Sequence, residues 1–419
     1  MKSATPYPSA HHLSIASACG AAHIWQHLPA PASALTISVI IPAKDEAAQL
    51  PATLAALAAQ TTLTGQPLSP ESYEILVLAN NCHDQTAAVV RAFARSHPAL
   101  RLCVAETTLA PAEAHVGRAR RLLMDEACRR LELAAGPRGI IASTDADTRV
   151  APTWLAATLA EFAAGADAVG GRIFPEPVPV QEGGLVRRTH LRDAQYRLLR
   201  SHLEALLDPE SGDPWPRHHQ HFGASLALTV AAYRQVGGLP VVPYLEDEAL
   251  WQALRRHDLQ LRHSPKVCVS TSGRHQGRVA VGLSWQLREW ASLLQQQREP
   301  LVESGASLVA EWQARRQLRE VWQQARQQVA LRPRCSVQLA ASLSVPVGAL
   351  VRELAQAETF GLLWEWVMQH RARWRRQRFM PLPLAVAELR QLVAQHAAAA
   401  SSGPALRLPD SRRAFSYAR

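Results

Sequence analysis

Short apolar runs alternate along the first 150 residues with segments that show the apolar spacing of amphipathic helices. The runs typical of buried strands are 36–42, 74–78, 101–105 and 139–142. Helical patterns at about 47–59 and 112–133 lie between them. This alternation predicts an α/β fold with a mixed, mostly parallel sheet flanked by helices. The loops that follow the strands then converge on one edge of that sheet.

Two acidic residues, Asp145 and Asp147, closely follow the apolar run 139–142. Carboxylates one residue apart can share a hard divalent cation and leave coordination positions for phosphate oxygens. Because open α/β sheets bind ligands at the carboxyl ends of their strands, the pair is a candidate site for a nucleotide diphosphate. From these residues alone, capping of a helix that begins near Pro152 explains the two acids equally well.

Motifs in sequence order resemble those of the family 2 glycosyltransferases of the GT-A fold. These are the first-strand motif at 39–46, the DXD motif at 145–147, the acceptor-side loop at 221–227, and the Gly-Gly turn at 237–238 followed by Glu246-Asp247. The resemblance covers roughly residues 35–275. We therefore expect a flexible N-terminal arm over residues 1–34, a GT-A catalytic domain over 35–290, and a basic, mostly helical C-terminal extension with a loose end over 291–419.

The resemblance implies a metal-dependent, inverting, non-processive hexosyltransferase that moves a sugar from a nucleotide-diphosphate sugar to a hydroxyl acceptor. A divalent metal, Mn²⁺ or Mg²⁺, would neutralise the leaving diphosphate. Asp247 is the expected base, with Glu246 beside it. The implied metal ligands are Asp147, Asp145 and His275. The other expected donor-site residues are Pro42, Lys44, Asp45, Glu46, Asn80, Asn81, Arg118, Arg274 and Arg278.

The segment before the acceptor-side loop is rich in histidine, tryptophan and proline. An indole can stack on the apolar face of a sugar, so this segment is expected to form an acceptor wall. The candidate acceptor residues are Trp215, His221, Phe222 and Gly223. A zinc site made by the histidines at 218, 219 and 221 is the alternative, although no cysteine or second spaced pair supports it.

The chain departs from the family pattern at two places. After the second strand, many members carry an acid that reads the nucleotide base, whereas this chain has Asn80 and Asn81. Amides donate as well as accept hydrogen bonds, so the identity of the base stays open. Residues 286–290, Gln-Leu-Arg-Glu-Trp, only approximate the signature of processive polysaccharide synthases.

Two other classes of protein share features of this pattern. A nucleotidyltransferase would need a Gly-rich basic loop after the first strand, and the segment 43–46, Ala-Lys-Asp-Glu, lacks one. A non-catalytic nucleotide-sugar-binding module would keep the fold and lose the acids, yet both acidic pairs are present. His275 can also be read as a surface-loop histidine.

Composition and charge narrow the expected partners. The net charge is +10, and residues 291–419 hold 18 arginines, no lysines and nine acids, so the surplus lies in the tail. A solvated helix face explains the Arg-rich cluster 371–378 better than a nucleic-acid site does. No apolar run approaches the ~20 residues that span a bilayer. Dispersed cysteines and the lack of a signal peptide favour the cytoplasm, with membrane contact at its inner face and a homodimer through the tail helices as open alternatives.

Overall fold

The computed structural model describes residues 23–176, 184–272, 282–327, 333–371 and 378–402. The chain divides into two compact units. The first consists of Met1–Val180 and Gln220–Glu289, and the second of Gln181–His219 and Trp290–Arg419. The sequence prediction placed one boundary at residue 290 and assigned the whole of 35–290 to one domain. In the structure, the segment 181–219 groups with the C-terminal residues.

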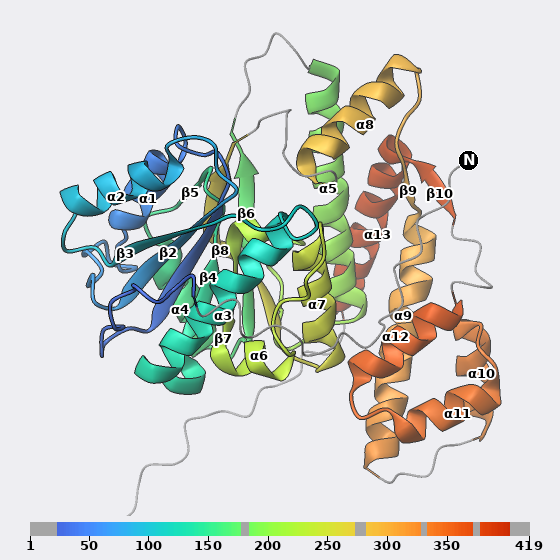
Figure 1. The fold of residues 1–419 in the computed structure, drawn as a ribbon. Coiled ribbons are helices and arrows are strands. Elements are labelled where there is room, and N and C mark those ends of the chain that lie inside the picture. Colours follow the sequence, from blue (N-terminus) through green and yellow to red (C-terminus); the bar gives the residue numbers. More distant parts are fainter. Residues whose placement is uncertain (1–22, 177–183, 273–281, 328–332, 372–377, 403–419) are drawn as a thin grey trace, which may run out of the picture. The chain divides into compact units, whose positions relative to one another are not determined.

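The first unit is built on an eight-stranded sheet with the strand order β3-β2-β1-β4-β7-β6-β8-β5 (Figure 1). The strands are β1 (Ile37–Ala43), β2 (Tyr73–Asn80), β3 (Leu102–Thr107), β4 (Ile140–Ser143), β5 (Thr148–Val150), β6 (Ala168–Pro175), β7 (Leu226–Thr229) and β8 (Leu261–Thr271). Strands β1 to β4 pair in parallel, as do β6 and β8, whereas β7 and β5 run antiparallel to their neighbours. The predicted mixed, mainly parallel sheet is confirmed.

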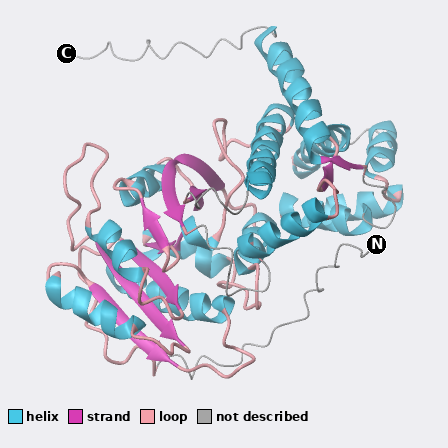
Figure 2. Cartoon of the chain, turned by 90° about the horizontal axis from the view of Figure 1, so that it is seen from above, coloured by secondary structure: helices cyan, strands magenta, loops and turns pink. Residues whose placement is uncertain are grey.

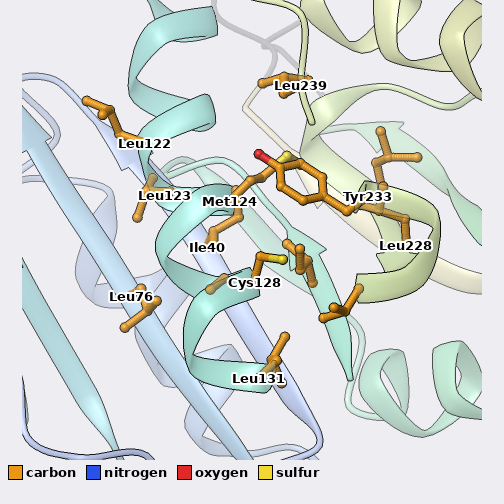
Figure 3. Packing of buried hydrophobic residues seen from close by; sticks show 14 of the residues in the cluster. Ile40, Leu76, Leu122, Leu123, Met124, Cys128, Leu131, Leu228, Tyr233 and Leu239 are labelled. Atoms are coloured by element: carbon orange, nitrogen blue, oxygen red, sulfur yellow. The ribbon is translucent and has the colours of Figure 1, made fainter. Parts of the chain in front are cut away.

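Helices cover both faces of this sheet (Figure 2). One face carries α3 (Val116–Ala134), α6 (Val230–Gln235) and α7 (Glu246–Arg256), and the other carries α1 (Leu50–Ala58), α2 (Thr86–Ser96) and α4 (Trp154–Ala163). Successive strand residues point to opposite faces, so Ile40 and Leu76 meet α3 while Val39 and Ile75 meet α1 and α4. Figure 3 shows the α3 side of this core.

The described part of the predicted N-terminal arm is packed. Trp25 is buried in the core beneath α3, and the carbonyl of Pro29 accepts a hydrogen bond of 2.8 Å from Nη1 of Arg130. Arg130 also binds the buried carboxylate of Glu74 on β2 with Nε and Nη2, and the Ser38 hydroxyl donates to the same carboxylate. Residues 23–34 are therefore held by apolar side chains, chiefly Trp25, and by a hydrogen bond from the buried Arg130, which the sequence pattern did not reveal.

The second unit is mainly helical. Its helices are α5 (Gly184–Leu207), α9 (Gly305–Arg326), α10 (Pro333–Leu343), α11 (Val347–Gln356), α12 (Phe360–Arg371) and α13 (Leu382–Ser402), and α8 (Leu283–Gln295) spans the boundary between the units. Two short strands, β9 (Leu301–Glu303) and β10 (Phe379–Pro381), pair antiparallel. Trp312 and Trp364 are buried, as expected for core anchors.

The described part of the C-terminal extension is mostly helical, as predicted. Helices α11 and α12 are separate, and α13 continues to Ser402. Helix α5, the longest in the described chain, was not predicted because its Arg-rich sequence has only a weak apolar stripe. None of the described helices is by itself long and apolar enough to cross a membrane.

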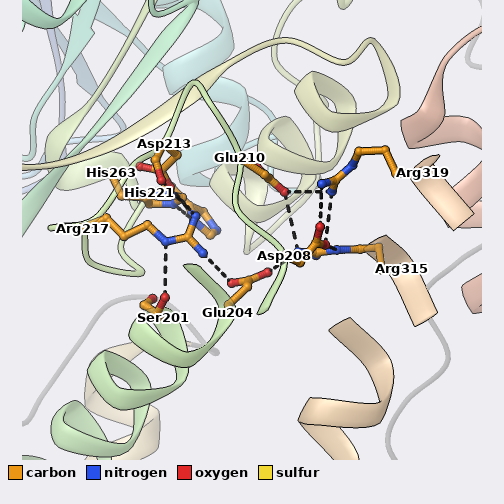
Figure 4. Close-up of polar contacts among 10 residues, drawn as sticks. All are labelled: Ser201, Glu204, Asp208, Glu210, Asp213, Arg217, His221, His263, Arg315 and Arg319. Carbon is orange, nitrogen blue, oxygen red and sulfur yellow. Dashed lines mark hydrogen bonds and ion pairs between the residues drawn. The ribbon is translucent and has the colours of Figure 1, made fainter. Parts of the chain in front are cut away.

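A buried charged cluster joins α5 to α9 within the second unit (Figure 4). Asp208, which has no exposed surface, accepts hydrogen bonds from the guanidinium groups of Arg315 and Arg319. Arg315 also donates to Glu204 over 2.7 Å, and Glu204 in turn pairs with Arg217. Because each buried carboxylate has cationic partners, the cluster fixes how the segment after α5 packs on α9.

Arg130→Ala is expected to lower the free energy of unfolding of the first unit by about 3–5 kcal/mol, because it leaves the Glu74 carboxylate buried without its cation. Urea denaturation of the full chain measures this loss. The control is Arg91→Ala, which removes a pair with Glu106 in which both side chains are about half exposed; it should cost no more than about 1 kcal/mol. Equal effects of the two changes would contradict the prediction.

Candidate functional site

The predicted acidic pair lies at the carboxyl end of β4, as expected for a binding edge. The hydroxyls of Ser143 and Thr144 donate to the carbonyls of Gly223 (2.8 Å) and Ala224 (3.0 Å). The strand end that carries Asp145 is thereby tied to the predicted acceptor-side loop. Two segments about 80 residues apart in sequence thus meet at one edge of the sheet.

The buried guanidinium group of Arg120, from α3, lies at the centre of this edge. It is 3% exposed; its Nη2 donates to Oδ1 of Asp145 over 2.6 Å, and its Nη1 donates to Oε1 of Glu246. Gly223 packs directly on the group, since a Cβ at this position would lie 2.3 Å from Cζ and Nη1 of Arg120. One arginine therefore joins the β4 acids, the start of α7 and the acceptor-side loop.

Four carboxyl groups, those of Asp145, Asp147, Glu246 and Asp247, lie near the single guanidinium group of Arg120 among the described residues of this edge. Burial raises the pKa of Asp145 to about 6; Arg120 acts in the opposite direction, and the nearby Asp147, Glu246 and Asp247 add to the rise. Burial also raises the pKa of Glu246. Such shifts are typical of carboxylates gathered where a cation binds. The pattern favours a ligand that brings positive charge, such as a metal ion.

The Asp247 carboxylate has a fixed orientation at the start of α7. Its Oδ2 accepts from the backbone N–H of Gly223 (2.9 Å), and its Oδ1 accepts from the N–H of Glu248 (2.8 Å). Leu245, which caps the helix, has a left-handed backbone with a φ of 58°. That conformation is costly for a leucine and is usually found where function demands it.

The loops that follow β1 and β2 are tied to one another. Asp45 accepts from the backbone N–H of His83 over 2.6 Å, and Asp84 accepts from the N–H of Ala47 over 3.0 Å. The hydrogen bond from His83 lowers the pKa of Asp45. Backbone N–H of Glu46 donates to Thr86 at the start of α2. Three of the expected donor-site residues, Lys44, Asp45 and Glu46, therefore lie in a braced loop.

Other expected donor-site residues have structural contacts of their own. The Asn81 amide donates to the carbonyl of Leu109 (2.9 Å) and accepts from its N–H (3.1 Å). Asn80 is buried at the end of β2, and Pro42 lies within β1. Arg118 lies 3.6 Å from Glu113. Asn81 thus braces the loop after β3, which limits what it can offer to a base.

Two sets of side chains could hold a metal ion. Asp45, Cys82 and Asp84 form the one group of three potential ligands within 4.8 Å found in the described part of the chain, but their carboxylates already accept backbone hydrogen bonds. Asp145 and Asp147 offer the hard oxygen donors that Mn²⁺ and Mg²⁺ prefer, so this pair fits such an ion. His275, Arg274 and Arg278 lie outside the described residues.

The expected acceptor residues are divided between the two units. Phe222 and Gly223 belong to the first unit, next to Asp247. Trp215 belongs to the second unit, where its ring stacks on His202 at 3.8 Å. His221 is largely buried and both its ring nitrogens have partners. Because the ring of His221 is engaged in this way, the alternative zinc site gains no support.

The sequence prediction selected Arg118 and missed the part played by Arg120. Residues two apart on a helix point in roughly opposite directions, so only one of the two arginines can face the acids, and the sequence alone does not show which. The sequence offered one signal, the glycine at position 117 near the start of α3. In the structure a Cβ at Gly117 would lie 2.1 Å from the carbonyl oxygen of Val242, so this glycine marks where α3 meets the segment before α7. Only the packed structure reveals which arginine turns toward the acids.

Comparison with known proteins identifies part of the chain. The family model described as Glycosyl transferase family 2 matches residues 38–217. This range includes Asp145 and Asp147 but ends before the acceptor-side loop and Glu246-Asp247. No curated protein matches the chain in sequence.

Several solved structures are similar to the chain over most of its length. The mannosyltransferase PcManGT from Pyrobaculum calidifontis, in complex with GDP-Man and Mn²⁺, is 16% identical, with 90% of this chain and 91% of that chain covered and a TM-score of 0.41. TarS 1–349 from S. aureus, in complex with UDP-GlcNAc, is 15% identical, with coverages of 83% and 94% and a TM-score of 0.40. GalNAc-T7 with UDP, GalNAc and Mn²⁺ is 14% identical, with coverages of 81% and 57% and a TM-score of 0.41.

Gly223→Ala is expected to destabilise the first unit by about 1–3 kcal/mol, because the new methyl group displaces the Arg120 guanidinium from the carboxylates of Asp145 and Glu246. Thermal unfolding of the full chain measures the effect. Gly282→Ala is the control, since a Cβ there meets no atom within 4 Å. An unchanged melting temperature for Gly223→Ala would show that Arg120 can move at little cost.

Proposed function

Residues 38–217 match the family model described as Glycosyl transferase family 2, and on this basis we propose that the chain transfers a sugar from a nucleotide-diphosphate sugar to a hydroxyl acceptor. The observation that carries the proposal is the bridge made by Arg120, which brings Asp145 and Glu246 into one acidic centre. The two acids come from motifs about 100 residues apart, and the second lies outside the matched range. Their meeting supports one active site with a donor side and an acceptor side.

On the donor side, Asp147 and Asp145 are proposed to hold a divalent metal ion, with His275 as a further ligand. The ion would neutralise the charge that develops on the leaving diphosphate. Arg120 keeps Asp145 in place and offsets the repulsion among the neighbouring acids. The loop after β1 carries Asp45 and Glu46 and is braced by the loop after β2. The two loops are proposed to support the nucleotide beside this centre.

On the acceptor side, Asp247 is proposed to take the proton of the attacking hydroxyl. Its two backbone hydrogen bonds orient the carboxylate before the acceptor binds. A carboxylate suffices as base, because the hydroxyl becomes acidic as its bond to the anomeric carbon forms. Attack from the face opposite the diphosphate is a single displacement, so the anomeric configuration is inverted. Glu246, held by Arg120, stays beside the base and is a positioning residue.

Asp147→Ala should abolish turnover of the nucleotide sugar that the wild-type chain hydrolyses best in a screen with Mn²⁺ or Mg²⁺, because the change removes a metal ligand. Excess chelator should give the same loss in the wild type, and added metal should reverse it. The control is Asp193→Ala, which removes an i,i+4 pair with Arg197 in the second unit. Full activity of Asp147→Ala, or of the chelated wild type, would refute the metal role.

Asp247→Asn should lower turnover by about 10²–10⁴-fold, as expected for the loss of a general base, and leave donor affinity unchanged. The amide oxygen can still accept from Gly223, so the loop keeps its main tie. Turnover kinetics and calorimetric titration with the donor measure the two quantities separately. A matching drop in donor affinity would assign Asp247 a structural role, and a product with retained anomeric configuration by NMR would refute the displacement.

A further inference from the structure

The imidazole of His221 is held on three sides within the first unit. Its Nε2 lies 3.1 Å from Oε2 of Glu248. Its Nδ1 lies 3.3 Å from Nε2 of His263, and Figure 4 shows these two rings. Its ring stacks on Trp251 with centroids 4.8 Å apart and planes 5° from parallel. A side chain fixed in this way has little freedom to follow a bound acceptor, which is the role that the sequence predicted for it.

Each hydrogen bond among Glu248, His221 and His263 has a defined donor and acceptor. Burial alone would raise the pKa of Glu248, but the hydrogen bonds from His221 and Gln252 and the nearby positive charge, including that of Arg255, together hold the pKa below its usual value. An ionised carboxylate only accepts, so Nε2 of His221 must donate to it. When the His221 ring is neutral, its Nδ1 is then an acceptor, and Nε2 of His263 must donate to it.

The same groups close a ring around the Asp247 carboxylate. From His221 the backbone runs through Phe222 to Gly223, whose N–H donates to Oδ2 of Asp247. From Glu248, the partner of His221, the backbone N–H donates to Oδ1 of Asp247. Both oxygens of this carboxylate therefore receive hydrogen bonds from segments that the His221–Glu248 contact holds together.

We propose that His221 is a positioning residue for the reaction: by linking Glu248 to the loop that carries Gly223, it fixes the carboxylate of Asp247. This inference rests on the proposed function of Asp247 as base. Trp251 and His263 support the ring, since the first fixes its plane and the second its tautomer. Loss of the link should leave the donor side of the centre intact, because Asp145 and Asp147 take no part in it.

The hydrogen-bonded ring can be tested without any substrate. In the full-length chain labelled with ¹⁵N-histidine, at a pH where the rings are neutral, His221 should show a protonated Nε2 and an unprotonated Nδ1. Its Nε2–H should exchange slowly with solvent, whereas that of the exposed His257 should exchange fast. The signal is assigned by its loss in His221→Gln. Rapid tautomer averaging of His221 would overturn the proposal.

Kinetics of three variants test the link to catalysis. His221→Phe can keep the stacking on Trp251 but makes no hydrogen bonds, whereas His221→Gln supplies one donor and one acceptor. The turnover of His221→Phe should fall about tenfold, the effect of losing one hydrogen bond to a charged group. Its calorimetric donor affinity should not change, and His221→Gln should recover part of the turnover. His257→Gln is the control, because His257 is exposed at the C-terminal end of α7. Its turnover should equal that of the wild type.

The outcomes separate this inference from the proposed function. If the wild-type chain hydrolyses no nucleotide sugar, the proposed function fails while the NMR measurement still tests the ring. If His221→Phe loses donor affinity and turnover together, or if His221→Gln recovers nothing, His221 is structural and the proposal is wrong. Should His221→Phe fail to fold, the NMR result on the wild type and the kinetics of His221→Gln decide.

Discussion

The rest of the candidate site depends on one buried guanidinium group. Arg120 reaches from α3 to two carboxylates that come from β4 and α7, and a glycine packs against its flat end. Without that cation, the acids at this edge would repel one another in a partly dry environment, and the pKa of Asp145 would rise further. The arginine thus allows a concentration of negative charge that could not otherwise be assembled in the apo protein.

The sheet makes this arrangement available because it carries both motifs to one edge. Strand β7 runs antiparallel to β4 and begins where the acceptor-side loop ends, so the loop must pass the carboxyl end of β4. The hydroxyls of Ser143 and Thr144 then tie the loop down. A parallel strand at this position would have sent the loop to the opposite edge.

The sequence predicted what local pattern can encode. Apolar runs indicate the strands β1 to β4. Short motifs indicate the acids after β4 and the acids that begin α7. The choice of Arg120 over Arg118, and the burial of His221 between Glu248 and Trp251, depend on helix phase and on partners far away in sequence. The packing of Trp25 and the grouping of 181–219 with the C-terminal helices are likewise properties of the folded chain, which no local spacing records.

The buried Asp208 cluster has a consequence for the order of events on the ribosome. Asp208 is synthesised 107 residues before Arg315, its principal partner. At the usual elongation rate of about 5–20 residues per second, the carboxylate waits roughly 5–20 seconds for its cation. Throughout that interval the carboxylate at the end of α5 cannot take up its buried position beside Arg315. The end of α5 can therefore reach its native packing only after α9 has been synthesised.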